Sequence, residues 1–325
     1  MRKLLLGLSG LYCLVLMIYA ILRLLSGDSL WWIALAHNFM PYCFLPMLFI
    51  LVGALIFRVR PLVGWSVVLL VVGLLWFLPL TIGRPTESAP SDLVLVTFNV
   101  YQHNTQLADA ENWLLLKHPD VIVLQQMAHG LADLPRLRAA YPHQTEHAGT
   151  PRENSAILSR WPISTTGVLN LQNSEQPWAT LDVAGKPVTI YNVHLEAPFV
   201  YFPRFNPPLL LHYDETTRNA QIADLLTQTA STPNPYLIAG DFNLNEFSPA
   251  YGRLDAALDD TYRQTRGDYG ATWPAGASEE LPNIFPLLFR FDYVWHSAGL
   301  RAVTGEVGPA LGSDHRPVFA VLALE

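Results

Sequence analysis

Cysteine and acidic residues are both scarce in parts of this 325-residue sequence. The two cysteines, Cys13 and Cys43, lie before residue 85, and the rest of the chain has none. That larger part therefore neither depends on disulfide bonds nor forms wrong ones in an oxidising compartment. Before residue 85 the sequence has a single acidic residue, Asp28, and apolar residues dominate. This composition excludes an ordinary soluble domain there, so the chain consists of two different parts.

Basic residues are few in the second part. Residues 85–325 hold 14 of the 20 Lys and Arg residues but 26 of the 27 Asp and Glu residues, which gives them a formal charge of −12. Proteins that bind a nucleic-acid backbone neutralise its phosphates with Lys and Arg, and they usually present a basic face. The acidic balance argues against nucleic acid as the partner, although it does not exclude a locally basic groove.

Long apolar stretches occupy the first part, residues 1–82. They are Leu4–Leu22, Phe39–Phe57 and Val63–Ile82. Each is close to the ~20 residues with which a helix crosses the hydrocarbon core of a membrane. The first follows Arg2 and Lys3, as in a signal peptide, but it is long, lacks a clean small-x-small cleavage site and precedes two further stretches. We therefore predict three transmembrane helices.

Charges in the connecting loops predict the orientation of these helices. Arg2 and Lys3 would share one side of the membrane with Arg58 and Arg60. Basic residues favour the cytoplasmic side, so we expect the second part to be extracytoplasmic in a multi-pass protein of the cell membrane. The bilayer is then an expected partner, and His37 is expected at its interface rather than in a buried role.

The second part alternates between patterns of strand and helix. Residues 83–92 contain two prolines and small polar residues, which predicts a linker. Beyond it, residues 93–325 form the predicted globular domain. Strands are predicted at Leu93–Asn99, Val121–Leu124, Ala156–Leu158, Val188–Val193, Tyr236–Ala239, Phe291–Val294 and Pro317–Leu324, and helices at Leu107–Lys117 and Thr216–Thr229. Mixed strands and helices over such a length indicate a layered α/β domain.

Polar residues suited to phosphate chemistry stand at the ends of these apolar runs. Asp241 and Asn243 follow a predicted strand, and strand alternation would place both on the same side. An Asx-turn is the alternative structural interpretation. Asp314 and His315 are adjacent in a predicted turn, downstream of Asp292. Carboxylate, amide and imidazole groups together are what metal-assisted attack of water on a phosphate ester requires.

In their order along the chain, these motifs resemble the endonuclease/exonuclease/phosphatase (DNase I-like) superfamily. The matching segments are Leu95–Asn99, Asp120–Gln126, Ser155–Arg160, Asn192–Leu195, Gly240–Asn243, Phe291–Val294 and Ser313–His315. The resemblance covers roughly residues 93 to 325, and Gly-Asp-Phe-Asn and Ser-Asp-His are its most specific parts. It implies a four-layer α/β sandwich, in which two packed β-sheets are flanked by helices and the site lies at one end.

The resemblance also implies a role for each catalytic candidate. His315 would be the general base, and Asp292 would orient its ring. Asp241 would help to bind or activate the attacking water. His194 would donate a hydrogen bond to a phosphoryl oxygen, and Asn243 would contact the phosphate.

Metal binding is the point at which the sequence departs from the family pattern. The resemblance places Asn99, Gln126 and Asp314 around Mg²⁺ or Mn²⁺, but the family motif normally ends Leu-Gln-Glu, and its Glu is the principal ligand. An amide oxygen can coordinate a hard cation without the charge that gives a carboxylate its affinity. Three outcomes stay open: weaker metal binding, a replacement carboxylate such as Glu153 or Glu196, or a site that binds without cutting.

Two apolar segments bear on the substrate. Phe199–Leu211 follows His194 closely, and Pro282–Phe291 leads into Asp292. Their prolines argue against regular core elements, so they suit contact with lipid or packing against other parts of the protein. We predict a membrane-anchored phosphoesterase with a lipid-linked, phosphate-containing substrate. The alternatives are an extracytoplasmic nuclease and a non-catalytic phosphate- or lipid-binding module. No obligate protein partner is inferred.

Overall fold

A computed structural model of the chain describes residues 2–78, 82, 91–201, 212–276 and 288–325. Most of the predicted linker and of the two apolar segments lies outside these residues (83–90, 202–211 and 277–287). The chain divides into two compact units. The first comprises Met1–Ile82, Phe199–Asp214 and Glu246–Pro249, and the second comprises Gly83–Pro198, Glu215–Asn245 and Ala250–Glu325.

The first unit is helical, with a two-stranded sheet. Its elements are α1 (Arg2–Ser26), α2 (Trp31–Phe44), α3 (Pro46–Ile56), α4 (Arg60–Phe77), β8 (Phe199–Tyr201) and β9 (His212–Asp214). Among the described residues, two helices are long and apolar enough to cross a membrane, and a bent pair makes up to three spans possible. The pair is α2 and α3, bent by 45°. The apolar stretch at Phe39–Phe57 is thus divided between two helices at Pro46, which has no N–H to continue the ladder of α2.

A buried polar cluster lies within the helical unit. The side chain of His37 is 1% exposed, so it lies inside the helical unit and not on its surface. Its Nδ1 atom lies 2.6 Å from the Tyr19 hydroxyl and 3.0 Å from Nη1 of Arg23, and its Nε2 atom lies 3.2 Å from the Gly27 carbonyl oxygen. These partners replace the hydrogen bonds to water that a buried imidazole loses, so burial is compatible with the polarity of the ring.

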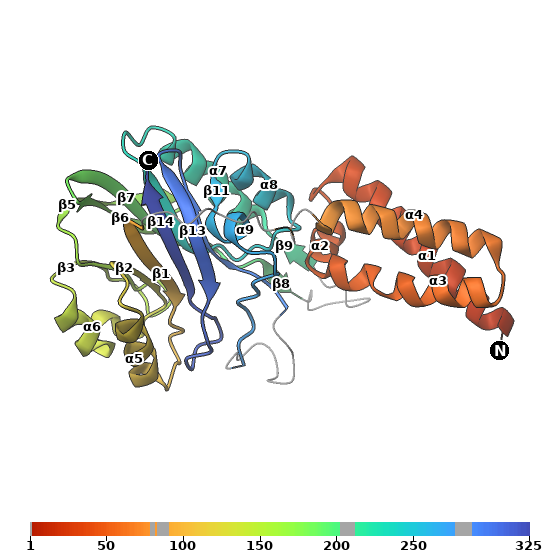
Figure 1. Cartoon of the computed structure of the whole chain (residues 1–325), viewed down its shortest axis with the longest axis horizontal. Coiled ribbons are helices and arrows are strands. Elements are labelled where there is room, and N and C mark those ends of the chain that lie inside the picture. The colour runs from red at the N-terminus through yellow and green to blue at the C-terminus, as the bar shows by residue number, and fades with distance from the viewer. Residues whose placement is uncertain (1, 79–81, 83–90, 202–211, 277–287) are drawn as a thin grey trace. The chain divides into compact units, whose positions relative to one another are not determined.

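The second unit contains two mixed six-stranded sheets (Figure 1). One has the order β13 (Leu300–Val307), β14 (Val318–Leu324), β1 (Leu93–Asn99), β2 (Val121–Gln125), β4 (Ser155–Ser159) and β3 (His143–His147). The other has the order β11 (Asp259–Asp260), β12 (Asp292–His296), β10 (Tyr236–Asp241), β7 (Lys186–His194), β6 (Ser174–Val183) and β5 (Ile163–Leu171). Their facing side chains, among them Leu95, Val123, Ile190 and Leu237, form one apolar core.

Helices cover the outer faces of these sheets. They are α5 (Leu107–Lys117), η2 (Gly130–Asp133), α6 (Pro135–Ala140), α7 (Thr216–Thr229), α8 (Pro249–Asp255) and α9 (Thr261–Thr265). Ala110 and Leu114 of α5 pack with Val96 and Ile122 on the outside of the first sheet. The α7 helix packs against β5 of the second sheet. The predicted α/β sandwich of two packed sheets flanked by helices is therefore confirmed.

Strand pairing brings the ends of several strands to one edge of each sheet. In the first sheet β1 and β2 are parallel, and Asn99 lies opposite Gln125. In the second, Asp241 lies opposite His194 on one side and opposite Asp292 on the other. A glycine is required just before Asp241, because Gly240 has φ +149° and a Cβ there would lie 1.8 Å from the Val193 carbonyl oxygen. Close approach of the β10 and β7 backbones thus places the polar strand ends together.

Candidate active site

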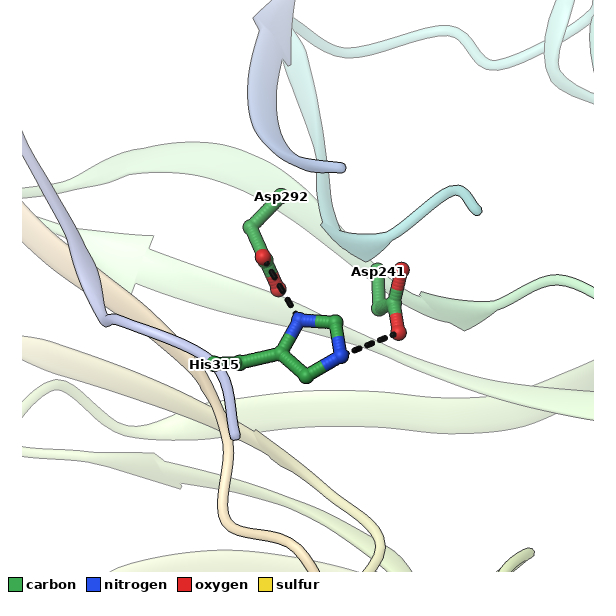
Figure 2. Close-up of side chains that lie close together, drawn as sticks. All are labelled: Asp241, Asp292 and His315. Atoms are coloured by element: carbon green, nitrogen blue, oxygen red, sulfur yellow. Dashed lines mark hydrogen bonds and ion pairs between the residues drawn. The ribbon is translucent and has the colours of Figure 1, made fainter. Parts of the chain in front are cut away.

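A buried hydrogen bond joins Asp292 and His315. Nδ1 of His315 lies 2.8 Å from Oδ2 of Asp292, and both side chains are buried (Figure 2). A carboxylate only accepts, so Nδ1 carries the proton and Nε2 faces the other way. The turn that presents the ring is held by Ser313, whose hydroxyl accepts from the His315 main-chain N–H and donates to the Asn99 carbonyl oxygen.

Asp241 completes the arrangement on the opposite side of the imidazole. Its Oδ2 atom lies 3.6 Å from Nε2 of His315 and accepts a hydrogen bond of 3.0 Å from Nδ2 of Asn99. Figure 2 shows the ring lying between the two carboxylates. Two strand ends and one turn, separated by up to 74 residues in sequence from Asp241 to His315, thus converge on one imidazole.

Charge determines the protonation of this cluster. Burial alone would lower the pKa of His315, but the carboxylates of Asp292 and Asp241 outweigh it and raise the pKa to about 10. Burial raises the pKa of Asp241, and the nearby charge of Asp292 acts in the same direction. The two carboxylates thus favour the protonated form of the imidazole.

Asn243 lies at the site in a way that strand alternation did not predict. The β10 strand ends at Asp241, and Asn243 has a left-handed backbone with φ +49°. Its main-chain N–H donates to Oδ1 of Asp241 across 2.9 Å, which is an Asx-turn. Its amide Nδ2 donates to the Leu195 carbonyl oxygen across 2.9 Å and lies 3.4 Å from Oδ2 of Asp241. The Asx-turn and proximity to the site, considered above as alternatives, occur together.

His194 occupies the site as an oriented ring. Nδ1 lies 3.2 Å from the Arg152 carbonyl oxygen, which only accepts, so Nδ1 carries a proton. Nε2 lies 3.2 Å from the amide nitrogen of Gln126 and 3.8 Å from Oδ2 of Asp241. Burial lowers the pKa of His194 despite the carboxylate of Asp241, which favours the neutral ring. In the neutral ring of this tautomer Nε2 carries a lone pair, so donation from Nε2 to a phosphoryl oxygen would require the protonated form of the ring.

Several residues of the site could hold a divalent cation. Asp241, Asp292 and His315 offer ligand atoms within 4.8 Å of one another. Asp292 and Asp314 each have one buried carboxylate oxygen without a hydrogen-bond partner among the described residues. Carboxylate and amide oxygens are preferred by Mg²⁺ and Mn²⁺, so the donor set fits such an ion. A cation between Asp292 and His315 would have to break their hydrogen bond, which favours the side of Asp241.

The candidate replacement carboxylates lie elsewhere. Glu153 is exposed, and its carboxylate accepts a hydrogen bond of 2.9 Å from the Thr150 main-chain N–H, which lowers its pKa. Glu196 is exposed as well. Neither belongs to the group of close ligand atoms found among the described residues.

Three residues that support the site were not predicted. Arg218, which is 2% exposed, donates from Nη1 to the Asn243 carbonyl oxygen across 2.7 Å. Gln176 accepts from the His194 main-chain N–H across 2.7 Å. Ser313 was part of a recognised motif without an assigned role. The contacts of Arg218 and Gln176 join distant segments, so no local sequence pattern indicates them.

Comparisons with known proteins agree with this fold. The model of the Endonuclease/Exonuclease/phosphatase family matches residues 96–315. No curated protein matches the sequence. D. rerio TDP2 complexed with a single-strand DNA product is 19% identical, with a TM-score of 0.57, over 71% of this chain and 98% of that one. The endonuclease/exonuclease/phosphatase from Bacteroides vulgatus is 17% identical, with a TM-score of 0.53, over 72% and 99% respectively. At these identities the structural likeness shows the fold alone.

Proposed function

The chain belongs to the endonuclease/exonuclease/phosphatase family, and we propose that its second unit catalyses divalent-metal-dependent hydrolysis of a phosphate ester or anhydride. The observation that carries the proposal is the placement of the His315 imidazole between Asp292 and Asp241 (Figure 2). Water would attack phosphorus directly, without a covalent intermediate.

In this proposal His315 is the base. Asp292 holds the proton on Nδ1, so Nε2 is the atom that accepts a proton from water. Asp241, 3.6 Å from Nε2, helps to hold that water. Asn243 supplies an amide to the phosphate.

The metal is Mg²⁺ or Mn²⁺, and the residues that would hold it are Asp241, Asn99, Gln126 and Asp314. Such an ion, when bound, polarises the phosphoryl oxygens, and its positive charge favours the neutral form of the nearby imidazole. Asn99 already contacts Asp241, and Gln126 reaches the same carboxylate through His194.

A lipid-linked phosphate is the proposed substrate class. The described residues of the first unit form two or three helices long and apolar enough to cross a membrane, and the second part of the sequence carries a formal charge of −12. A membrane-anchored, extracytoplasmic domain of this charge suits a substrate embedded in a bilayer better than a polyanionic nucleic acid.

A nuclease is the second candidate. Its support is the similarity in fold to TDP2, one structure of which holds a single-strand DNA product. The low content of Lys and Arg opposes it. A non-catalytic phosphate- or lipid-binding module is the third candidate, because Gln126 occupies the position where the family normally has a carboxylate.

One panel of substrates separates these functions. The purified chain would be incubated with single-stranded and duplex DNA, RNA, phospholipid and a polyprenyl pyrophosphate, with Mn²⁺ or with a chelator. We expect metal-dependent release of phosphate from the polyprenyl pyrophosphate or cleavage of the phospholipid. Cleavage of DNA or RNA alone would establish the nuclease, and binding without any cleavage would establish the module.

A further inference from the structure

His194 is held by contacts at both ring nitrogens and at its main-chain N–H. Nδ1 donates to the Arg152 carbonyl oxygen, and the main-chain N–H donates to Gln176. With Nδ1 protonated, Nε2 of the neutral ring carries the lone pair, and the amide nitrogen of Gln126 lies 3.2 Å from it. The lone pair is thus directed to the side on which Gln126 and Asp241 lie. Protein metal sites commonly orient a ligating histidine in this way, through a hydrogen bond from the other ring nitrogen to a carbonyl oxygen.

The separations around Nε2 suit a shared metal ion. Nε2 lies 3.2 Å from the Gln126 amide nitrogen and 3.8 Å from Oδ2 of Asp241. Adjacent ligands at about 2.1 Å from one ion lie about 3.0 to 3.4 Å apart in octahedral or tetrahedral geometry. The Gln126 separation lies within this range, and the Asp241 separation requires a shift of a few tenths of an ångström. A half-turn of the terminal amide would exchange the positions of its two atoms and present the Gln126 oxygen to the ion.

We propose that His194 is itself a metal ligand, through Nε2, together with Asp241 and the amide oxygen of Gln126. This inference rests on the proposed function only in placing a cation at the site. A nitrogen ligand beside one carboxylate and one neutral amide selects a first-row transition ion such as Mn²⁺, Co²⁺ or Zn²⁺ over Mg²⁺, which prefers oxygen. The imidazole thus compensates for the carboxylate that Gln126 lacks, and it does so for one class of metal only.

The alternative is a purely structural role, in which Gln126 only stabilises the orientation of the His194 ring through a hydrogen bond. The two accounts differ in what binds the metal. A supporting contact leaves an oxygen-only site, in which Mg²⁺ and Mn²⁺ compete on similar terms. A nitrogen ligand appears directly in the spectrum of a bound paramagnetic ion.

Electron spin echo spectroscopy of Mn²⁺ bound to the full-length, detergent-solubilised chain tests the proposal. We expect modulation from a directly bound nitrogen, and we expect the pattern to change when the protein is produced with ¹⁵N-histidine. This comparison needs no substitution, so it does not depend on a variant folding. Absence of nitrogen modulation in the parent protein, or absence of Mn²⁺ binding, would overturn the proposal.

Substitutions show which histidine supplies the bound nitrogen. In His194→Ala and His194→Gln the nitrogen signal should disappear, with affinity for Mn²⁺ falling by about tenfold or more and affinity for Mg²⁺ changing little. His129→Ala is the matched control, because its side chain is 79% exposed, and it should retain the signal. A nitrogen signal that persists in folded His194→Gln would assign the ligand to another histidine and refute the proposal.

Binding and turnover are measured separately, so the two proposals can fail independently. Nitrogen-ligated Mn²⁺ in a protein that cleaves no substrate would retain the ligand assignment and refute the phosphoesterase. Metal-dependent cleavage by a protein whose Mn²⁺ has no bound nitrogen would retain the phosphoesterase and refute the ligand assignment.

Discussion

His315 donates from Nδ1 to Oδ2 of Asp292 across 2.8 Å, and both side chains are buried. This single hydrogen bond selects the tautomer of the imidazole and turns Nε2 toward Asp241. The proposed base therefore owes its orientation to a strand residue that lies 23 positions earlier in the chain.

Asp292→Asn should preserve the shape of the site but not the tautomer. An asparagine can donate to Nδ1, which would move the ring proton to Nε2 and block proton acceptance there. We expect the rate of hydrolysis at saturating metal and substrate to fall by about 10²- to 10⁴-fold. Asp259→Asn, on the neighbouring strand and exposed, is the control and should retain the parent rate. A parent-like rate in folded Asp292→Asn would show that the ring needs no such partner.

Gln126→Glu should strengthen metal binding. The substitution restores a negative charge next to His194 and Asp241, and ligand charge tunes affinity for hard cations. We expect the concentration of Mg²⁺ or Mn²⁺ for half-maximal activity to fall by roughly tenfold. Gln144→Glu adds the same charge at an exposed position and should leave it unchanged.

The result also discriminates between functions. An inert parent and an active Gln126→Glu variant would favour the binding module over the enzyme. Unchanged metal dependence would mean that another residue supplies the charge.

The stability of the second unit should depend on pH through Asp260. Its carboxylate accepts from Nη1 and Nη2 of Arg290 at 2.8 and 2.6 Å, and both residues are buried. Burial alone would raise the pKa of Asp260, but the guanidinium outweighs it, so the pKa is lowered. A lowered pKa stabilises the fold above the unfolded value of about 3.9, and this stabilisation is lost as pH falls through the lower folded value.

Asp260→Asn should therefore reduce the free energy of unfolding by about 3–5 kcal/mol at pH 7, since it leaves a buried guanidinium without its carboxylate. The difference from the parent should shrink below a pH of about 4. Denaturant unfolding at several pH values measures it. A difference that stays constant down to a pH of about 2 would contradict this assignment.

Topology is predicted by the loop charges. A reporter that is active only outside the cytoplasm should be active when fused after residue 90 and inactive when fused after Arg60. The reason is that Arg58 and Arg60 favour the cytoplasmic side. Activity of a reporter restricted to the cytoplasm, when fused after residue 90, would refute the extracytoplasmic placement.

Strong local patterns explain which elements could be predicted from the sequence. The β1 strand, α5 and α7 have the predicted bounds, because continuous apolar runs or helical spacing mark them clearly. The β5 strand was not predicted, since most of its residues are exposed or half-buried and polar, with no alternation to mark it. The β6 strand includes Pro177, which weakens a strand signal.

The site also contains both features that the sequence could predict and features that it could not. Asp241, Asp292 and His315 could be named in advance because each stands in a recognisable short motif. The contact between Gln126 and His194 could not, because it joins segments 68 residues apart in the chain. The tautomer of His194 depends on the Arg152 carbonyl oxygen, and no sequence pattern records such a contact.

The most direct test of the central claim is phosphate release by the parent and by His315→Ala at saturating Mn²⁺. Circular dichroism and thermal unfolding would establish that both proteins are folded. The parent should hydrolyse at least one substrate of the panel, and a chelator should abolish the reaction. His315→Ala should be slower by about 10²- to 10⁴-fold. Hydrolysis of every substrate by folded His315→Ala at the parent rate would contradict the account.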